Sequence, residues 1–297
     1  MMTATTNHPA ISVIGLGSMG AALARALVSK GFKVTVWNRN MEKAQPLIDA
    51  GAIAAADAKV AIEASPVIVV CVSEYKVTRR ILEADGVAAA LQGRTLLQLS
   101  TGTPKDARDL DAWAKQHSAY CLNGDIMAWP KQMGTDAATI SVSGDANVYQ
   151  QQENVLRALA GNIVYLGTEP GASGGLFHAV LAYLAGSWIG FCHGALVAEK
   201  EGLRPEDFGI LLEQISPILS AELRHMGEVI QHGRFSDPES TVKTTGEDLL
   251  LLVQQAKEAG INSELPEFAA NLFKRTMDAG HGLEEHAAVI KVLRTTV

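Results

Sequence analysis

The chain has 297 residues, 47% of them hydrophobic, so it is long enough to form two domains with sizeable cores. Its net charge of −7 argues against a general nucleic-acid-binding role, although a local basic corner for a single phosphate remains compatible with it. The three cysteines are few and odd in number, and their spacing fits neither a disulfide framework nor a metal site. The N-terminal MMTATTNHPA lacks the basic and apolar regions of a signal peptide, so we expect a cytoplasmic protein.

The first predicted elements are a strand, a helix and a second strand. Ile11–Ile14 is a short apolar run typical of a buried parallel strand. Apolar residues recur at helical spacing over Ala21–Ser29, and Gly31 ends that helix. Lys33–Trp37 is rich in residues that favour strands. The order predicts one βαβ unit.

The turn after the first strand has the pattern G-x-G-x-x-G. It consists of Gly15, Leu16, Gly17, Ser18, Met19 and Gly20. In such a unit Gly15 permits the tight turn, Gly17 lets the backbone approach a pyrophosphate, and Gly20 lets helix and strand pack closely. The free N–H groups and the dipole of the helix N-terminus then hold the phosphates. The pattern predicts dinucleotide binding, with a purely structural turn as the alternative.

The end of the second strand indicates which dinucleotide is bound. A site for NAD usually has Asp or Glu about 20 residues after the glycines, to bind the ribose 2′-hydroxyl. Here the strand ends Trp37-Asn38-Arg39-Asn40, with Lys43 one turn further on. Arg39 offers a planar fork for a 2′-phosphate and Lys43 a point charge. This pair of basic residues predicts NADPH. The alternative is that both are solvent-exposed and bind no ligand.

Further strands complete an open parallel sheet over residues 1–165. A helix is predicted at Ala44–Ala50 and strands at Val67–Val72, Leu96–Leu99, Tyr120–Asn123, Ala138–Ser143 and Ile163–Tyr165. Ligands lie outside the carboxyl ends of such strands, so further cofactor contacts are expected. They are Cys71, Val72, Ser73, Thr101 and Met127. Because Ser and Thr favour helix caps, a cap is the alternative for Ser73 and Thr101.

The second half is all-helical. Ala172–Ala198 contains no Asp, Glu, Lys or Arg and is long enough to span a bilayer. We favour a buried helix, because the run holds two histidines and many small residues and follows a soluble domain. Further helices are predicted at Pro205–Gln214, Ile218–Gln231, Thr244–Ala259, Leu265–Asp278 and Glu284–Leu293. The sequence therefore predicts an α/β Rossmann domain, a long interdomain helix over 166–200 and a helical domain over 201–297 that pairs in a homodimer, with no membrane span.

The order of these parts resembles the β-hydroxyacid dehydrogenase superfamily, and more closely its imine reductases and reductive aminases. The similar segments are VTVWNRN–MEKAQPLIDAGA, LSTGTPKDARDLDAWA, LNGDIMAWPKQMGT, GINSELPEF and DAGHGLEEHAAVIKVLR. The resemblance implies NADPH, hydride transfer to a C=N bond, and a homodimer with exchanged helices. It also implies that Asn38, Arg39, Asn40 and Lys43 take the 2′-phosphate.

The catalytic position departs from the family pattern. In the family, a glycine-rich segment begins the long helix, and Asp or Tyr stands six residues after its first Gly. Hydroxyacid dehydrogenases have Lys at that position. Counted from Gly171, that position is Phe177, which cannot transfer a proton. His178 can, but it points about 100° away around a helix. We expect Phe177 to shape a pocket and His178 to pack, with His178 as donor the alternative.

The remaining candidates are aromatic and acidic side chains near these elements. Asp125 and Tyr183 are further catalytic candidates, and Trp129 and Trp188 are expected in the substrate pocket with Phe177. A pre-formed iminium needs no proton from the enzyme. The predicted function is therefore an NADPH-dependent imine reductase or reductive aminase acting on an imine, or on an amine and a carbonyl compound. The alternatives are a β-hydroxyacid dehydrogenase, which the missing Lys and Val180-Leu181 disfavour, and an NADPH-binding homologue with reduced catalysis.

Overall fold

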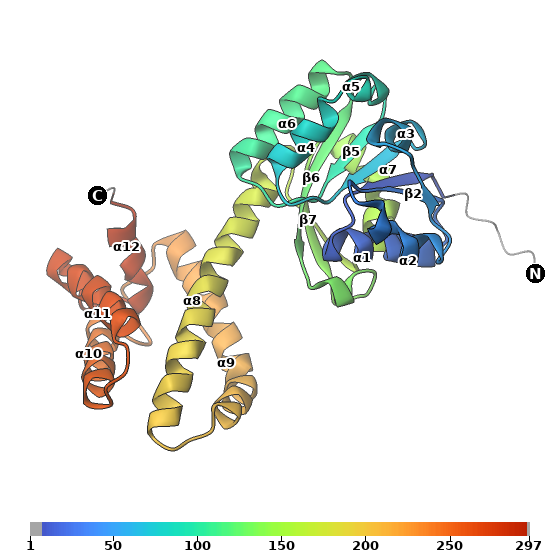
Figure 1. Cartoon of the computed structure of the whole chain (residues 1–297). Coiled ribbons are helices and arrows are strands. Elements are labelled where there is room, and N and C mark those ends of the chain that lie inside the picture. Colours follow the sequence, from blue (N-terminus) through green and yellow to red (C-terminus); the bar gives the residue numbers. More distant parts are fainter. Residues whose placement is uncertain (1–7, 296–297) are drawn as a thin grey trace, which may run out of the picture. The chain divides into compact units, whose positions relative to one another are not determined.

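The computed structural model describes residues 8–295. They divide into two compact units, one ending at Ala182 and the other beginning at Tyr183 (Figure 1). The long helix α8, Ala172–Lys200, contributes to both units, because the division falls inside it.

The N-terminal unit is built on one eight-stranded sheet. Its strands are β1 Ile11–Ile14, β2 Val34–Trp37, β3 Ile53–Ala54, β4 Val67–Val70, β5 Thr95–Gln98, β6 Tyr120–Met127, β7 Thr139–Gly144 and β8 Asn162–Tyr165. They lie in the order β3-β2-β1-β4-β5-β6-β7-β8, and all neighbours are parallel except β6 and β7. The strand order reverses between β1 and β4. Such a reversal opens a crevice at the carboxyl ends of these strands.

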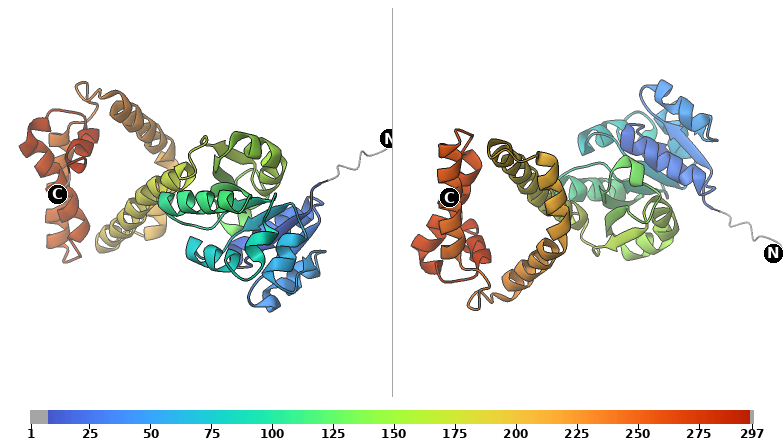
Figure 2. Two further views of the ribbon diagram at one scale, coloured as in Figure 1. Left: turned by 90° about the horizontal axis from the view of Figure 1, so that it is seen from above. Right: turned by 90° about the horizontal axis from the view of Figure 1, so that it is seen from below.

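Helices cover both faces of the sheet, as the two views of Figure 2 show. They are α1 Ser18–Ser29, η1 Met41–Ala44, α2 Gln45–Ile48, α3 Ala58–Glu63, α4 Tyr75–Leu82, α5 Val87–Ala90, α6 Pro104–Gln116, η2 Pro130–Gln132 and α7 Ala146–Leu159. Adjacent strand residues point to opposite faces. Val13 therefore packs with Leu23 and Leu156 in one core, while Ile14 packs with Ile62 and Leu110 in the other.

The C-terminal unit contains the rest of α8 and the remaining helices. These are α9 Pro205–His232, α10 Val242–Glu258, α11 Glu264–Thr276, the π-helical turn η3 Met277–His281, η4 His286–Ala288 and α12 Val289–Leu293. Helices α10 and α11 pack side by side (Figure 2). The buried core of this unit is small, and its members are Val229, Phe235, Val242, Ala287 and Ala288.

The predictions for two regions of the chain differ from the structure. The strand expected at Tyr120–Asn123 continues to Met127, because residues 124–127 pair with β7. Cross-strand pairing outweighs the turn preference of Asn-Gly-Asp. The two helices expected around Pro217 form the single helix α9. Pro217 removes one backbone donor, but the carbonyl that this donor would bond belongs to Glu213, which is exposed and can bond to water.

Helix α8 is long and apolar enough to cross a membrane by length and composition alone. Little of its most apolar stretch is buried within the chain, so the apolar surface of α8 is left uncovered by the helices around it.

Candidate functional site

The glycine turn between β1 and α1 has the geometry that the motif requires. Gly15 has a φ of +95°, and a Cβ there would overlap the carbonyl of Cys71. A Cβ on Gly20 would overlap the carbonyl of Gly15. A Cβ on Gly17 would meet no atom within 4 Å, so Gly17 borders open space. The turn is therefore tight on the protein side and open on the side where a pyrophosphate would approach.

The N-terminus of α1 is free to bind an anion. Gly17 is the N-cap residue, no side chain caps the helix, and its first turn holds no acidic residue. The Leu16 N–H is already used, because it donates to Asn38 Oδ1 at 3.0 Å, and the Leu16 side chain is buried. Ser18, Met19 and Gly20 therefore present the backbone donors that a phosphate group would accept.

A cleft of about 590 Å³ lies at the carboxyl ends of β1, β2 and β4. It brings together most of the predicted cofactor residues, namely Gly15, Gly17, Ser18, Met19, Gly20, Asn38, Arg39, Asn40, Lys43, Cys71, Val72 and Ser73. Four lining residues were not predicted: Trp37, Val77, Arg80 and Ile81. The last three are spaced i, i+3 and i+4 and so lie on one face of α4. The position of this helix directly after β4 could have indicated that this face lines the cleft.

The basic corner of this cleft is formed by Arg39 and Lys43. Both are exposed, and neither forms an ion pair with any of the residues the structure describes. Glu42 does not line the cleft, and its carboxylate accepts a hydrogen bond from Asn40. Asn38 links the glycine turn to the end of β2, because its Nδ2 donates to the Asn40 carbonyl at 2.8 Å. Two uncompensated cations therefore face the position where a 2′-phosphate would lie.

The helix-cap alternative for Ser73 and Thr101 is wrong. The N-cap residues of the helices that follow are Glu74 and Thr103. Ser73 lines the cleft, whereas Thr101 and Met127 do not. They follow or end the neighbouring strands β5 and β6, beyond the part of the sheet edge that the cleft occupies.

Asp125 is a buried carboxyl on β6. Burial raises the pKa of Asp125 to about 6, while the neighbouring Ser173 hydroxyl and the positive charge of His178 act in the opposite direction. The Ser173 hydroxyl also donates to the Asn123 carbonyl at 3.1 Å. The structure thus places a carboxyl that titrates near neutral pH beside the start of α8.

His178 is exposed within the described residues, so its packing against another helix stays a prediction for the assembled dimer. Its Nδ1 lies 2.7 Å from the Gly174 carbonyl, which can only accept, so Nδ1 carries the hydrogen. Nε2 is then free to receive or donate a proton. Phe177 is half-buried, and its ring meets the His178 ring edge-on at 5.9 Å.

The other aromatic candidates are exposed side chains. Trp129 follows β6 and is 70% exposed. Tyr183 and Trp188 lie on the part of α8 that belongs to the C-terminal unit, and both are exposed there.

Comparison with known proteins agrees with this geometry. Residues 10–167 match the family model for the NAD binding domain of 6-phosphogluconate dehydrogenase, and residues 169–295 match that for the C-terminal domain of NADPH-dependent reductive aminase-like proteins. The chain is 29% identical to the NADPH-dependent reductive aminase of Aspergillus oryzae, over 96% of this chain and 97% of that protein. It is 28% identical to the L-threonate dehydrogenase of Cupriavidus necator, over 95% of each. The structure of an imine reductase from Myxococcus stipitatus in complex with NADP+ superposes with a TM-score of 0.91 at 28% identity, covering 96% of this chain and all of that one.

The fold, the glycine turn and the cleft define an NAD(P)-binding oxidoreductase with a helical C-terminal domain. Within that class, the chain belongs to the imine reductase and reductive aminase family of the β-hydroxyacid dehydrogenase superfamily, as the resemblance predicted.

Proposed function

We propose that the protein is an NADPH-dependent reductase of C=N bonds, acting on an imine, an iminium, or the imine formed from an amine and a carbonyl compound. The observation that carries this proposal is the composition of α8. From Ala172 to Ala198 it contains no lysine or arginine, and the position of the family's proton donor is Phe177. A hydroxyacid substrate would need a positive charge for its carboxylate, whereas an iminium carries its own charge.

The cofactor would lie along the cleft. Gly15, Gly17 and the N–H groups of Ser18 and Met19 would hold the pyrophosphate. Arg39 and Lys43 would hold the 2′-phosphate, with Asn38 and Asn40 fixing the corner between them. When bound, NADPH supplies a hydride to the carbon of the C=N bond. Ser73 and the backbone at Cys71 and Val72 line the cleft beyond the pyrophosphate turn, and Thr101 and Met127 lie further along the sheet edge.

His178 is the proposed proton donor for a neutral imine. Its Nδ1–H is held by the Gly174 carbonyl, so Nε2 is the nitrogen that gives a proton to the substrate nitrogen. Asp125 is the neighbouring carboxyl, close enough for the charge of His178 to act on it. A substrate that is already an iminium would need only the hydride. Phe177 would then shape an apolar wall, with Trp129, Tyr183 and Trp188 as candidate aromatic faces for a cation.

The proposed assembly is a cytoplasmic homodimer. The parts are a cofactor domain over 1–165, an interdomain helix over 166–200 and a dimerisation and substrate domain over 201–297. Large apolar side chains of the C-terminal unit are exposed, among them Trp188, Ile189 and Ile218. An exposed apolar surface of this kind marks a contact site for another protein or for a membrane. A second copy of α8 and α9 would cover it and would make membrane insertion unnecessary.

The experiment is a steady-state assay of NADPH consumption with a cyclic imine, its N-alkylated iminium, and a hydroxyacid with NADP+ in the reverse direction. We expect turnover of both C=N substrates and none of the hydroxyacid. Turnover of the hydroxyacid alone would favour the dehydrogenase alternative. NADPH binding without turnover of any substrate would favour a homologue with reduced catalysis.

A further inference from the structure

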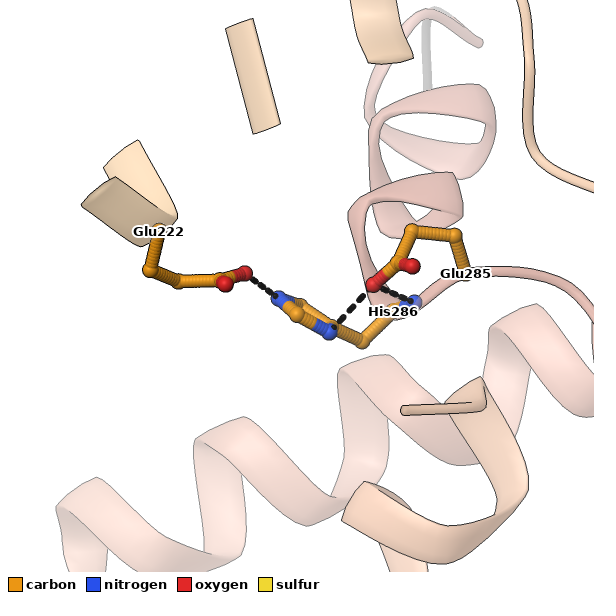
Figure 3. A group of neighbouring side chains, drawn as sticks. All are labelled: Glu222, Glu285 and His286. Carbon is orange, nitrogen blue, oxygen red and sulfur yellow. Dashed lines mark hydrogen bonds and ion pairs between the residues drawn. The ribbon is translucent and has the colours of Figure 1, made fainter. Parts of the chain in front are cut away.

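A cluster of metal-ligating side chains lies in the C-terminal unit, away from the cofactor cleft. Figure 3 shows His286 between Glu222 of α9 and Glu285, which directly precedes η4. His286 Nε2 is 3.1 Å from Glu222 Oε1, and His286 Nδ1 is 2.7 Å from Glu285 Oε1. His225 of α9 approaches the other oxygen of Glu285 at 3.5 Å.

The carboxylates of this cluster lack a full counter-charge. Glu285 is 1% exposed, and within residues 8–295 neither Glu285 nor Glu222 pairs with a lysine or arginine. Two backbone N–H groups, those of Glu239 and His286, donate to Glu285 and hold it in place. With both histidines neutral, the cluster carries two negative charges, one of them on the buried Glu285. Such a site is costly unless a cation joins it.

The side chains of the cluster approach one another closely, but their atoms are not aligned as hydrogen bonds. Glu222 Oε1, His225 Nε2 and His286 Nδ1 are buried atoms that have no aligned hydrogen-bond partner. A donor and acceptor at 2.7–3.1 Å normally align. Ligand atoms around a common ion are instead arranged about that ion, with no need to point at one another.

The spacing of the donor atoms suits one small ion. One nitrogen of His286 and one oxygen each from Glu222 and Glu285 lie within 4.8 Å of one another. Ligands bound at about 2.0–2.2 Å are at most about 4.4 Å apart, so small side-chain rotations bring the three onto one ion. One imidazole with two carboxylates is a donor set for divalent first-row transition metals, and the lack of sulfur disfavours softer ions.

We propose that Glu222, Glu285 and His286 bind a divalent transition-metal ion of the zinc class, with water completing its coordination. The ion would join α9 to the start of η4, two segments far apart in the sequence. The two residues after His286, Ala287 and Ala288, belong to the small buried core of this unit. The role is therefore structural: the ion holds η4 against α9 and stabilises the C-terminal unit, independently of NADPH.

The test uses tag-free full-length protein treated with a chelator and then titrated with ZnCl2. Zinc binding is measured by calorimetry and by metal analysis of the dialysed protein, and thermal unfolding is followed in parallel. We expect one zinc ion per chain and a rise in the unfolding midpoint. His286→Gln and Glu222→Gln should each weaken zinc binding by about tenfold or more.

His232→Gln is the matched control, because His232 is an exposed histidine at the end of the same helix α9. It should bind zinc as the wild type does. Glu222 is partly exposed, so Glu222→Gln tests the site even where His286→Gln disturbs folding. Zinc uptake that is equal in the wild type and in both cluster variants, or no uptake at micromolar zinc, would overturn the proposal. An unfolding midpoint that responds to pH but not to zinc would also overturn it, because a proton on His286 would then balance the charge.

Discussion

The two units differ in how completely each one buries its own apolar side chains. In the N-terminal unit both faces of the sheet are covered, and side chains such as Ile14, Leu23 and Leu97 are completely buried. In the C-terminal unit the core is small, and Trp188, Ile218 and other large apolar residues remain exposed. A parallel sheet with helices on both faces forms a complete core from one chain, whereas a few long helices leave apolar faces that need a partner.

The cofactor cleft and two of the aromatic candidates lie in different units. The cleft and the Asp125–His178 pair lie wholly within the N-terminal unit, while Tyr183 and Trp188 belong to the C-terminal one. In the proposed function, the N-terminal unit supplies the hydride and the proton. The exposed aromatic side chains proposed to contact the substrate belong to the C-terminal unit.

The largest expected effect tests which unit supplies the proton. His178→Ala should lower turnover of a neutral cyclic imine by on the order of 10²–10⁴, because a positioned general acid is lost. Turnover of the N-alkylated iminium should change little, because that substrate needs no proton. Steady-state kinetics on both substrates, with Tyr183→Phe as the matched variant, would measure this. If Tyr183→Phe lost turnover of the neutral imine and His178→Ala did not, the proton donor would be Tyr183 of the C-terminal unit.

The next effect concerns the stability of the N-terminal unit. The folded pKa of Asp125 is about 6, above the ordinary value of 3.8, so folding disfavours its charged form. The contribution of Asp125 to stability is then fully present below about pH 4 and is lost as pH rises through about 6. Asp125→Asn should remove this fall and gain up to about 3 kcal/mol near pH 8, with no gain near pH 4.

Urea unfolding at these two pH values measures the gain, with Asp85→Asn as a control at an exposed aspartate. A gain for Asp125→Asn that is equal at both pH values would mean that desolvation of the carboxylate is not its cause.

A smaller effect concerns cofactor choice. The wild type should favour NADPH over NADH by at least about tenfold, and Arg39→Ala should raise the Michaelis constant for NADPH by a similar factor. The reason is that one charge-assisted contact contributes about 1.5–3 kcal/mol. The constant for NADH should stay nearly unchanged. Arg25→Ala, which removes an exposed arginine of α1 outside the cleft, is the control. Equal use of both cofactors by the wild type would contradict the assignment of the basic corner.

Local patterns predicted the N-terminal unit well. The glycine turn and the basic corner each occupy a few consecutive residues, and they line one cleft in the structure. The strand before the glycine turn forms at Ile11–Ile14, as predicted. Features set by distant pairing were not predictable in this way. The strand through Asp125 depends on β7, and the exposure of His178 depends on what surrounds the start of α8.

The cluster in the C-terminal unit shows the same limit. Glu222 of α9 and His286 of η4 are far apart in the sequence, and only the fold brings them into contact. Arg80 of α4 likewise joins the cleft through the position of its helix beside the sheet. Periodicity could show which face of α4 is apolar, but it could not show which ligand that face would meet.

The most direct test of the difference between the units is the oligomeric state of the full-length protein. Sedimentation velocity over a wide dilution series, with activity assayed at each concentration, measures it. The account predicts a dimer whose dissociation is accompanied by loss of activity and of folded structure, because the apolar surface of α8 and α9 requires a second copy. A monodisperse monomer that stays folded and fully active would contradict it.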